Sequence, residues 1–545
     1  MDVDVEIGAA SVASSSERFP PEVLALIFES LRPSRSKLPS GKLMHSDDNT
    51  LLSIVHVCKF WREVAFSHAI LWASEVDVSA HPHPNMTAIV LGKSGSQPLD
   101  VKLHYVTEEY DQVVLAMWFT DPYRSRIRSL DVETTGVRAM RRLIKVIGSE
   151  LPSLRSLKLL NEAEQDPDLM NGLYEEPPAM ALPRLGLLQI RRARALERIE
   201  LRDYLLPWTS PHLFARVTHL ELHVTAEEPS NHLPTHSQLH AVITVMQSLE
   251  TLILDDVFPV YSGVRPGSPI PLPSTCRSVV LRACHYHGNC RDLLSALRFP
   301  TECSLTIDQV CREREDAEEA DVITMLAGSQ RRPQVASVKT DPFEQLCGEF
   351  SVAYDASAYL SSPEKLLHSP IVPAPHVTFQ FEVTTQTIEQ EDWDEEDSKT
   401  VSYDRMQTAI THVNLSDLLV LRIDEMREAD EFHLCNGMDA YHGERTTPIL
   451  DTAENVKILV LADTSLHILM FLENPSDMTG KLVLPRLETV VVPESTKSYS
   501  ANSLKGYFAK RAEQGLSVPA VRAPQSLSDT SFAQDLGENV TVTYF

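Results

Sequence analysis

Residues 18–31 read RFPPEVLALIFESL, and residues 50–72 read TLLSIVHVCKFWREVAFSHAILW. Pro21 suits the first turn of a helix, where a backbone N–H has no partner in any case. Apolar residues then recur at the i, i+3, i+4, i+7 spacing of one helical face, namely Leu24, Ile27, Phe28 and Leu31. The second stretch has the same spacing, so the sequence predicts a small helical head over residues 18–74. About fifty residues make a marginal core, and we expect a second protein to cover part of its apolar surface.

The order of motifs in this head resembles the F-box. That family has a Leu-Pro-x-Glu opening, a Leu-Ile-Phe helix, a Val-Cys-Lys-x-Trp-Arg segment and a closing Leu-Trp pair. Phe19 replaces the opening leucine, and the long insert after Arg32 resembles that of many F-box proteins from mushroom-forming fungi. The residues that match the pattern are Pro20, Glu22, Leu24, Ile27, Phe28, Val57, Cys58, Lys59, Trp61, Arg62, Leu71 and Trp72.

The resemblance implies that the head docks on a Skp-type adaptor and, through it, on a cullin. The adaptor-binding residues would be Phe19, Pro20, Glu22, Leu24, Ile27, Phe28, Val57, Cys58, Trp61, Leu71 and Trp72. The alternative is a purely structural helical cap, because apolar residues at helical spacing are usually core. The sequence alone leaves open which of them face inward and which face a partner.

Composition narrows the possible partners. The 545 residues include 76 acidic and 49 basic side chains, for a net charge of −27. Such a chain repels phosphate backbones and anionic lipids, so we expect no nucleic-acid and no membrane role. We read residues 1–17 as a disordered acidic tail without the features of a secretory signal. Eight scattered cysteines favour free thiols and a cytoplasmic or nuclear location.

Short apolar triplets recur through residues 75–545. Their spacing is 25–32 residues at first, followed by a gap of 74 residues between Leu305 and Phe379 and then steps of 31–42. A period near thirty with an LxxLxL pattern is typical of leucine-rich repeats. The central residues are Val76, Val101, Leu130, Leu157, Leu188, Leu220, Leu252, Val279, Leu305, Phe379, Leu421, Leu459 and Val490.

Helix-capable segments lie between several triplets, and alternation of this kind requires parallel strands with crossover connections. We therefore expect an α/β fold, in which an all-α head is followed by an irregular leucine-rich-repeat solenoid with a parallel sheet. Loop insertions are expected near residues 259–273 and 361–400. The alternative is an ordinary doubly wound α/β domain. The expected helices are 108–119, 137–147, 238–247, 291–297 and 317–326.

In an LxxLxL strand the variable positions point away from the core, and we expect a protein substrate to bind there. The candidates are Asp131, Lys158, Gln189, His219, Glu221 and Arg422. The alternative is a solvated strand surface without a ligand. Later repeats carry apolar residues such as Val460 and Val491 at these positions, which predicts that the carboxy-terminal segment or a neighbouring loop covers that end of the sheet.

The sequence contains no pattern that predicts catalysis. The Gly-Lys-Ser at 92–94 lacks the first glycine of a phosphate loop. The CHYHGNC run at 284–290 has soft ligands without paired spacing, so we expect no metal and no cofactor. The first hypothesis is a non-enzymatic, substrate-recruiting F-box subunit of a Skp–cullin–RING ubiquitin ligase. The second is a repeat scaffold unconnected with ubiquitin, and the third is an enzyme built on the α/β region.

Overall fold

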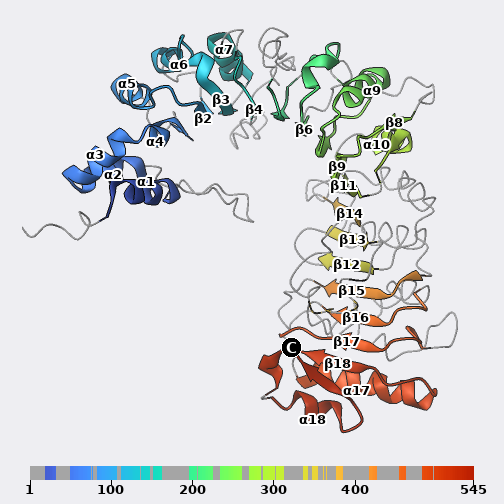
Figure 1. The fold of residues 1–545 in the computed structure, drawn as a ribbon. Helices are drawn as coiled ribbons and strands as arrows, with labels where there is room; N and C mark the ends of the chain where they lie inside the picture. Colours follow the sequence, from blue (N-terminus) through green and yellow to red (C-terminus); the bar gives the residue numbers. More distant parts are fainter. Residues whose placement is uncertain are drawn as a thin grey trace, which may run out of the picture. The chain divides into compact units, whose positions relative to one another are not determined.

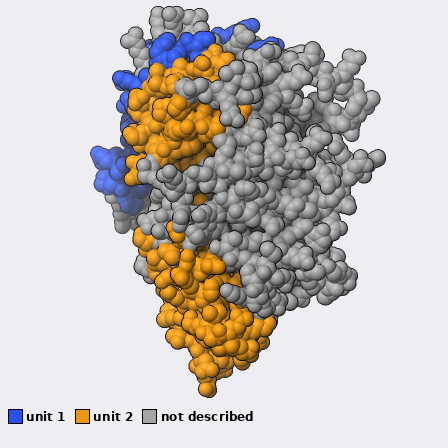
Figure 2. Space-filling model, turned by 90° about the vertical axis from the view of Figure 1, so that its right-hand side faces the viewer, with its two compact units in different colours: residues 1–217 blue, residues 218–545 orange. Residues whose placement is uncertain are grey.

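The structure is a computed structural model, and it divides the chain into two compact units, residues 1–217 and 218–545 (Figure 2). Each unit is described by itself. Apart from a few single positions, the residues described are 19–31, 50–74, 76–77, 83–106, 112–134, 137–147, 151–161, 195–204, 206–224, 233–259, 269–283, 287–300, 302–311, 335–341, 347–353, 376–383, 417–425, 453–461, 482–494, 498–528 and 530–545. Among these residues, no helix is both long and apolar enough to cross a membrane.

Unit 1 begins with the predicted helical head, which consists of four short helices (Figure 1). They are α1 (Pro21–Ser30), α2 (Thr50–Val57), α3 (Lys59–Ser67) and α4 (Ala69–Ala73). Their buried side chains form one small core, made of Leu24, Ala25, Phe28, Ile54, Val55, Val64, Ala65, Leu71, Trp72 and Ala73. The tail at 1–17 and the insert at 32–49 lie outside the described residues.

The Val-Cys-Lys-x-Trp-Arg segment is explained by local contacts. Cys58 is the N-cap of α3, and its Sγ accepts a hydrogen bond from the backbone N–H of Trp61 at 3.4 Å. Arg62 donates from Nε to the carbonyl of Val55 at 2.8 Å, near the end of α2 where carbonyls lose their helical partners. The Trp61 ring packs on Phe28 with centroids 5.0 Å apart. The motif therefore sets the angle between α2 and α3 and fixes both against α1.

Strands and helices alternate through the rest of unit 1. In order these are β1 (Val76–Asp77), α5 (Pro84–Lys93), β2 (Leu99–Val106), α6 (Gln112–Trp118), the 3₁₀ turn η2 (Arg124–Arg126), β3 (Ile127–Thr134), α7 (Val137–Ile147), β4 (Ser156–Asn161), β5 (Arg198–Arg202) and the 3₁₀ turn η4 (Pro211–Phe214). Strands β1 to β5 pair in parallel, each with the next along the chain. Helices α5, α6 and α7 lie along one side of these strands (Figure 1).

The register of these strands places like residues next to each other. Val101 pairs with Leu130, which pairs with Leu157, which pairs with Ile199. These four side chains are buried, and the residues between them face the opposite side. Parallel pairing of the apolar triplets, as predicted, is therefore present throughout unit 1.

The predicted triplet around Leu188 lies outside the described residues, and another segment fills the position beside β4. The triplet around Leu188 was expected to follow Leu157, but β4 pairs directly with β5, so that Leu157 lies beside Ile199. Residues 162–194 lie outside the described residues. The position beside β4 is filled by the Arg-Ile-Glu-Leu-Arg sequence at 198–202, which was not predicted to be a strand.

A turn of one kind precedes the strands in both units. The N–H of the residue that ends the turn bonds to the carbonyl three residues earlier, as in Leu154 to Leu151, Leu249 to Met246 and Leu487 to Leu484. Among the described residues the same bond occurs before ten strands, namely β2, β3, β4, β6, β7, β9, β11, β16, β17 and β19. The residue after the turn then donates to the neighbouring strand entrance, as Arg155 does to the carbonyl of Arg128 at 2.7 Å. The chain thus repeats a turn-and-strand unit.

Unit 2 contains β6 (His219–His223), α9 (His236–Val245), β7 (Thr251–Asp255), β8 (Ile270–Pro271), β9 (Ser278–Ala283), α10 (His287–Ala296), β10 (Leu297–Arg298), β11 (Ser304–Cys311), β12 (Val335–Asp341), β13 (Cys347–Ala353), β14 (His376–Val383), β15 (Val420–Glu425), β16 (Ile458–Leu461), β17 (Thr489–Val491), α17 (Ser498–Glu513), β18 (Ala520–Ala523), the 3₁₀ turn η8 (Gln525–Leu527), α18 (Phe532–Leu536) and β19 (Val542–Tyr544). Helices α6, α7, α9 and α10 confirm four of the predicted helices to within a few residues. The fifth, at 317–326, lies outside the described residues.

The long gap between triplets contains a departure from simple repetition. Strand β14 pairs in parallel with β11, β13 pairs antiparallel with both β14 and β12, and β12 pairs in parallel with β15. The order in space is therefore β11, β14, β13, β12, β15. The gap thus contains two further strands, β12 and β13, and β13 runs against the others. Among the described residues, the other strand pairs of this sheet in unit 2 are parallel.

The carboxy-terminal end of unit 2 is covered, as predicted. Val460 and Val491 are fully buried, in a cluster with Ala353, Val420 and Ile458. The side chain of the last residue, Phe545, packs against this cluster together with Leu419. Phe545 is held by its backbone, which donates to the carbonyl of Ala523 at 3.0 Å and accepts from the N–H of Gln525 at 3.0 Å. The carboxy terminus therefore covers the apolar end of the sheet.

A buried arginine fixes α17 to the turn before β17. Arg511 is fully buried and donates to the carbonyls of Leu484 (2.7 Å), Pro485 (3.1 Å) and Ser517 (2.9 Å). It also reaches the hydroxyl of Tyr507 at 3.0 Å. Leu484 has a φ of 52°, in the left-handed region, and directs its carbonyl to the guanidinium. Hydrogen bonds to carbonyls thus compensate the burial of this charge.

Candidate functional sites

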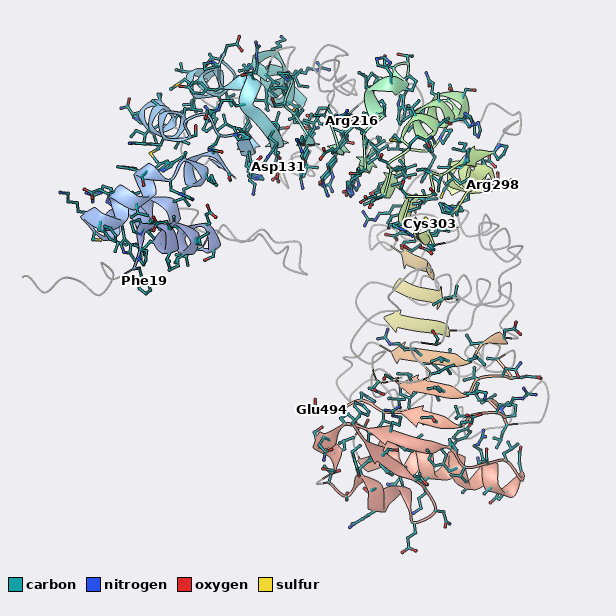
Figure 3. All side chains as sticks on the ribbon, in the orientation of Figure 1. Phe19, Asp131, Arg216, Arg298, Cys303 and Glu494 are labelled. Carbon is teal, nitrogen blue, oxygen red and sulfur yellow. The ribbon has the colours of Figure 1, made fainter. Side chains whose placement is uncertain are left out.

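The head carries an apolar surface that its own core leaves open. Leu26 is 64% exposed, Val57 57% and Phe19 50%. Figure 3 shows Phe19 at the edge of the head. We call the exposed large apolar side chains of the head the head face: Phe19, Val23, Leu26, Leu31, Val57 and Ile70. Exposed apolar surface of this kind favours binding of a partner.

Helix α1 explains how this face arises. Its sequence, PEVLALIFES, is apolar on nearly all sides. Leu24, Ala25 and Phe28 point into the core, which leaves Val23 and Leu26 on the outer side. A helix that is apolar all round is normally buried all round. Because α1 is buried on one side only, its outer side lacks a partner in the isolated chain.

The predicted adaptor-binding residues divide into three groups. Phe19, Pro20, Glu22 and Val57 are exposed. Ile27, Cys58 and Trp61 are half-buried, with Cys58 engaged as a helix cap. The remaining four side chains fill the core of the head and have no surface to offer a partner, which corrects their assignment as contact residues: Leu24, Phe28, Leu71 and Trp72.

Sequence reasoning missed four members of the head face, namely Val23, Leu26, Leu31 as an outward residue, and Ile70. A signal was available, because Val23 and Leu26 are apolar residues three apart and lie off the face that Leu24 and Phe28 define. A second apolar stripe on a surface helix predicts a second contact.

The strands of unit 1 carry a second candidate surface, on the side away from α5, α6 and α7. Figure 3 shows Asp131 on this side. Oppositely charged residues pair along the register, so that Asp77 lies beside Lys102, then Asp131, Lys158 and Glu200. Lys158 and Glu200 form an ion pair with Nζ and Oε1 2.7 Å apart. We call this side of β2 to β5 the unit 1 polar face.

Asp131 is the most constrained residue of this face. Its Oδ1 is buried and has no hydrogen-bond partner among the described residues. Burial raises the pKa of the Asp131 carboxyl, although the positive charges of Lys158, His104 and Lys102 act to lower it. The predicted residues Asp131 and Lys158 are thus brought side by side. The third predicted member, Gln189, lies outside the described residues, and Glu200 fills the ladder position beside Lys158.

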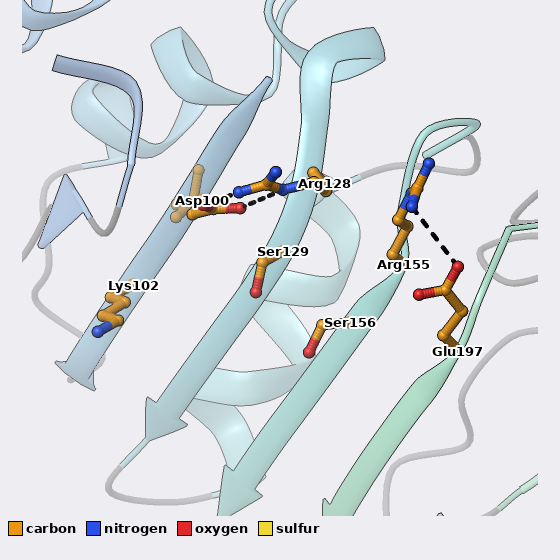
Figure 4. A pocket seen from close by; sticks show the side chains of 8 residues that line it. Asp100, Lys102, Arg128, Ser129, Arg155, Ser156 and Glu197 are labelled. Carbon is orange, nitrogen blue, oxygen red and sulfur yellow. Dashed lines mark hydrogen bonds and ion pairs between the residues drawn. The ribbon is translucent and has the colours of Figure 1, made fainter. Parts of the chain in front are cut away.

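A hollow of about 410 Å³ opens at the strand entrances of the unit 1 polar face (Figure 4). Two ion pairs flank it. Arg128 forms a fork with Asp100, donating from Nε at 3.0 Å and from Nη2 at 2.5 Å. Arg155 lies 3.6 Å from Glu197. Ser129 and Ser156 are paired in register and lie between the two pairs, and Lys102 completes the polar lining.

The predicted residues His219 and Glu221 lie in unit 2, in a titratable cluster. The Glu221 carboxylate contacts His219 Nε2 at 3.2 Å and His223 Nε2 at 2.9 Å. The other nitrogen of His223 lies 2.9 Å from Asp255. Hydrogen bonds to the two histidines lower the pKa of Glu221 despite its burial. Burial acts to lower the pKa of His223, but its hydrogen bonds to Asp255 and Glu221 outweigh this and raise it.

The last predicted substrate residue, Arg422, is buried, with 8% of its surface exposed. It lies on β15 next to the covered apolar cluster, because its register partner on β16 is Val460. It therefore offers little surface to a partner, which corrects the prediction.

The described cysteines Cys58, Cys276, Cys290 and Cys303 are free thiols. Cys276 and Cys303 are buried on adjacent repeats with their sulfurs 3.9 Å apart. Among the residues that the structure describes, no three histidine, cysteine or carboxylate side chains gather in a way that could hold a metal ion.

Comparison with known proteins identifies the head. A family model described as F-box-like matches residues 17–74. Domains of this kind generally mediate binding to Skp1 in SCF ubiquitin ligases. The match supports the F-box resemblance and covers the head only. No curated protein matches the chain.

Proposed function

We propose that this chain is the substrate-recruiting F-box subunit of a Skp–cullin–RING ubiquitin ligase. In this proposal the head binds a Skp-type adaptor and the strand region binds a protein target. The chain itself catalyses nothing and needs no cofactor, because the ubiquitin-transfer chemistry lies on other subunits. Its contribution is to hold the target close to the transfer site in a suitable orientation.

The observation that carries the proposal is the head face. It lies within the F-box-like match and exposes Leu26 and Val57 more than half. Burying apolar surface contributes about 25 cal/mol per Å². Six exposed apolar side chains in a head of this size therefore favour docking of an adaptor over exposure to water.

The repeated turn-and-strand unit supports the second half of the proposal. A turn with one recurring hydrogen bond, an LxxLxL strand and in-register parallel pairing are together the features of a leucine-rich-repeat solenoid. Such arrays offer a long strand surface of variable polar residues, as on the unit 1 polar face. We infer an irregular array of this type, located in the cytoplasm or nucleus and without a nucleic-acid or membrane partner.

A leucine-rich-repeat scaffold unconnected with ubiquitin is the alternative. It is favoured only by the fact that solenoids need a capping unit, a role the head would fill. A cap has no reason to expose Leu26 and Val57 on its outer side, and this makes the alternative the weaker one.

Co-purification of the full chain with a Skp-type adaptor tests the proposal. We expect Leu26→Asp and Val57→Asp to abolish the complex, because each replaces one of the most exposed apolar side chains of the head by a charge. Val113→Asp is the matched control, since Val113 is 60% exposed on α6, outside the head. An adaptor complex that survives both head variants, or none with the unmodified chain, would contradict the proposal.

A further inference from the structure

The hollow on the unit 1 polar face is lined by hydrogen-bond donors that are not fully used within the chain. The fork between Arg128 and Asp100 uses Nε and Nη2 of the arginine and both carboxylate oxygens. Nη1 of Arg128 is left over on a side chain that is about half exposed, whereas Asp100 is almost covered. The positive partner of this pair therefore faces the hollow.

The second pair leaves its cation even more available. Arg155 approaches Glu197 only to 3.6 Å, and its side chain is 59% exposed. Exposed pairs of this geometry contribute little, about 0–1 kcal/mol, so a better acceptor can replace the carboxylate. Between the pairs, the hydroxyls of Ser129 and Ser156 have no hydrogen-bond partner among the described residues.

These groups act together because of the register. Ser129 and Ser156 are directly paired, and each follows an arginine, so two Arg-Ser dipeptides lie one strand apart. Neighbouring strands are about 4.8 Å apart, close enough for one oxyanion to reach both. Arginine forks and hydroxyl donors are the groups that hold carboxylates and phosphates. Among the residues lining the hollow, three cations stand against two carboxylates in a chain with a net charge of −27.

We propose that this hollow binds an anionic side chain of a protein partner, a carboxylate or a phosphate ester. Arg128 and Arg155 supply the charge-assisted hydrogen bonds, and Ser129 and Ser156 supply neutral ones. The proposal rests on the proposed function, since it assigns the chemistry that the strand region selects in a recruited target. An open hollow of about 410 Å³ suits one such side chain entering from solvent.

Unit 2 contains a natural control for this site. Arg277-Ser278 occupies the same place in its repeat as Arg155-Ser156, and Arg277 is also 59% exposed and paired with a glutamate of the next repeat, Glu302. The strand entrance on its other side carries Glu250 instead of a second arginine. Arg277 therefore matches Arg155 in position and exposure and lacks the second cation.

The test uses the full chain and fluorescent degenerate peptide libraries whose fixed central residue is phosphoserine, glutamate or serine. Binding is followed by fluorescence anisotropy. We expect an anionic library to bind at least tenfold more tightly than the serine library. We expect Arg155→Gln to weaken it about tenfold, the size of one lost charge-assisted hydrogen bond, and Arg277→Gln to leave it unchanged.

The outcomes separate the sources of the anion. Preference for phosphoserine over glutamate identifies a phosphorylated partner, and equal binding identifies a carboxylate partner. Equal binding of the serine library overturns the proposal, as does an Arg155→Gln variant that binds like the unmodified chain. Adaptor co-purification is measured on the same samples. Arg155→Gln retains the adaptor and Leu26→Asp retains peptide binding, so failure of this site is distinguishable from failure of the ligase assignment.

Discussion

The strands of unit 1 and the last strands of unit 2 have the same backbone arrangement. At one equivalent position, however, the first carry charged side chains and the last carry apolar ones. In β3, β4 and β5 the residue after the central apolar one is Asp131, Lys158 or Glu200. In β16 and β17 it is Val460 or Val491, which are fully buried under the end of the chain. The backbone pairing is parallel and in register in both places.

This difference shows that one position decides how a strand surface is used. An apolar residue there draws Phe545 and Leu419 over the sheet, and the surface becomes core. A charged residue pairs with its register neighbour, as Lys158 does with Glu200, so that ion pairs hold the surface. The polar strands offer exposed charge at their entrances, as at Arg155, while the apolar strands are buried and contribute stability.

The most direct test exchanges apolar and polar side chains on the two strand surfaces. Val460→Lys buries an unpaired charge beneath Phe545, and we expect it to lower the free energy of unfolding of unit 2 by about 4 kcal/mol. Ser156→Val, on the unit 1 polar face, exchanges a half-buried hydroxyl for an apolar side chain and should cost about 1 kcal/mol or less. Urea unfolding followed by circular dichroism measures both. Equal costs for the two variants would contradict the distinction between the ends.

The second largest loss of stability is expected when the buried hydrogen bonds of Arg511 are removed. Arg511→Met keeps the apolar stem but removes the donors that serve the carbonyls of Leu484, Pro485 and Ser517. Leaving buried acceptors without donors costs about 1–3 kcal/mol each when they cannot reach water, and we expect a total loss near 3 kcal/mol. The urea midpoint of the variant tests this. The neighbouring Lys510→Met should leave the midpoint unchanged, and a loss as large as that of Arg511→Met would show that the hydrogen bonds are not responsible.

Removing the cover itself should have a smaller effect. Phe545→Ala retains the backbone hydrogen bonds and deletes only the ring over the Val460 cluster. The ring is partly buried, so we expect a loss of about 1–2 kcal/mol and faster amide exchange in β15, β16 and β17. Hydrogen-exchange mass spectrometry measures this. Tyr544→Ala, on the other side of β19, is the control, and equal protection of these strands in Phe545→Ala would refute the role of the ring.

A polar surface within unit 2 should respond to pH. His223 contacts Glu221 through one nitrogen and Asp255 through the other, and only the protonated ring donates both hydrogen bonds. The pKa of His223 is raised, so its contribution to stability is complete below its unfolded pKa of about 6.5 and is lost as the pH rises through the folded pKa. The pKa of Glu221 is lowered, so its contribution is complete above its unfolded pKa and is lost progressively as the pH falls below it, outside the range of the His223 change.

We therefore expect the urea midpoint of unit 2 to fall between pH 5.5 and pH 8. The His223→Gln variant should lack most of this fall, because it removes the group that titrates. The change is expected to be the smallest of the four. A midpoint that is constant over this range in the unmodified chain would show that His223 does not change its charge on unfolding.

The sequence predicted where strands form better than it predicted which strands pair with each other. Twelve of the thirteen predicted centres lie in strands, because the alternation of apolar residues is local. The position beside β4 was predicted wrongly. LPRLGLLQI at 182–190 is a fuller match to the repeat pattern than LERIEL at 196–201, yet β5 fills the position. Which of two similar segments pairs with a strand depends on packing that a one-dimensional pattern does not contain.

The candidate sites were predicted only in part, because they too depend on packing and strand pairing. Leu24 and Phe28 share a face with Ile27, and periodicity alone does not distinguish the side that meets α3 from the side that meets solvent. The hollow was not foreseen, although its signal is present in the sequence. Two Arg-Ser dipeptides, 27 residues apart at the start of successive strands, predict paired arginines once the strands are known to be parallel and in register.

The reversed run of β14, β13 and β12 has a consequence for how the array is assembled. In a regular solenoid each unit contacts only its neighbours in sequence, so folding can propagate from one unit to the next along the chain. Between β11 and β15 this is impossible, because β12 has no place until β13 and β14 have bridged the distance back to β11. These three strands must therefore form together, and we expect their joint formation to be a slow step in the folding of unit 2.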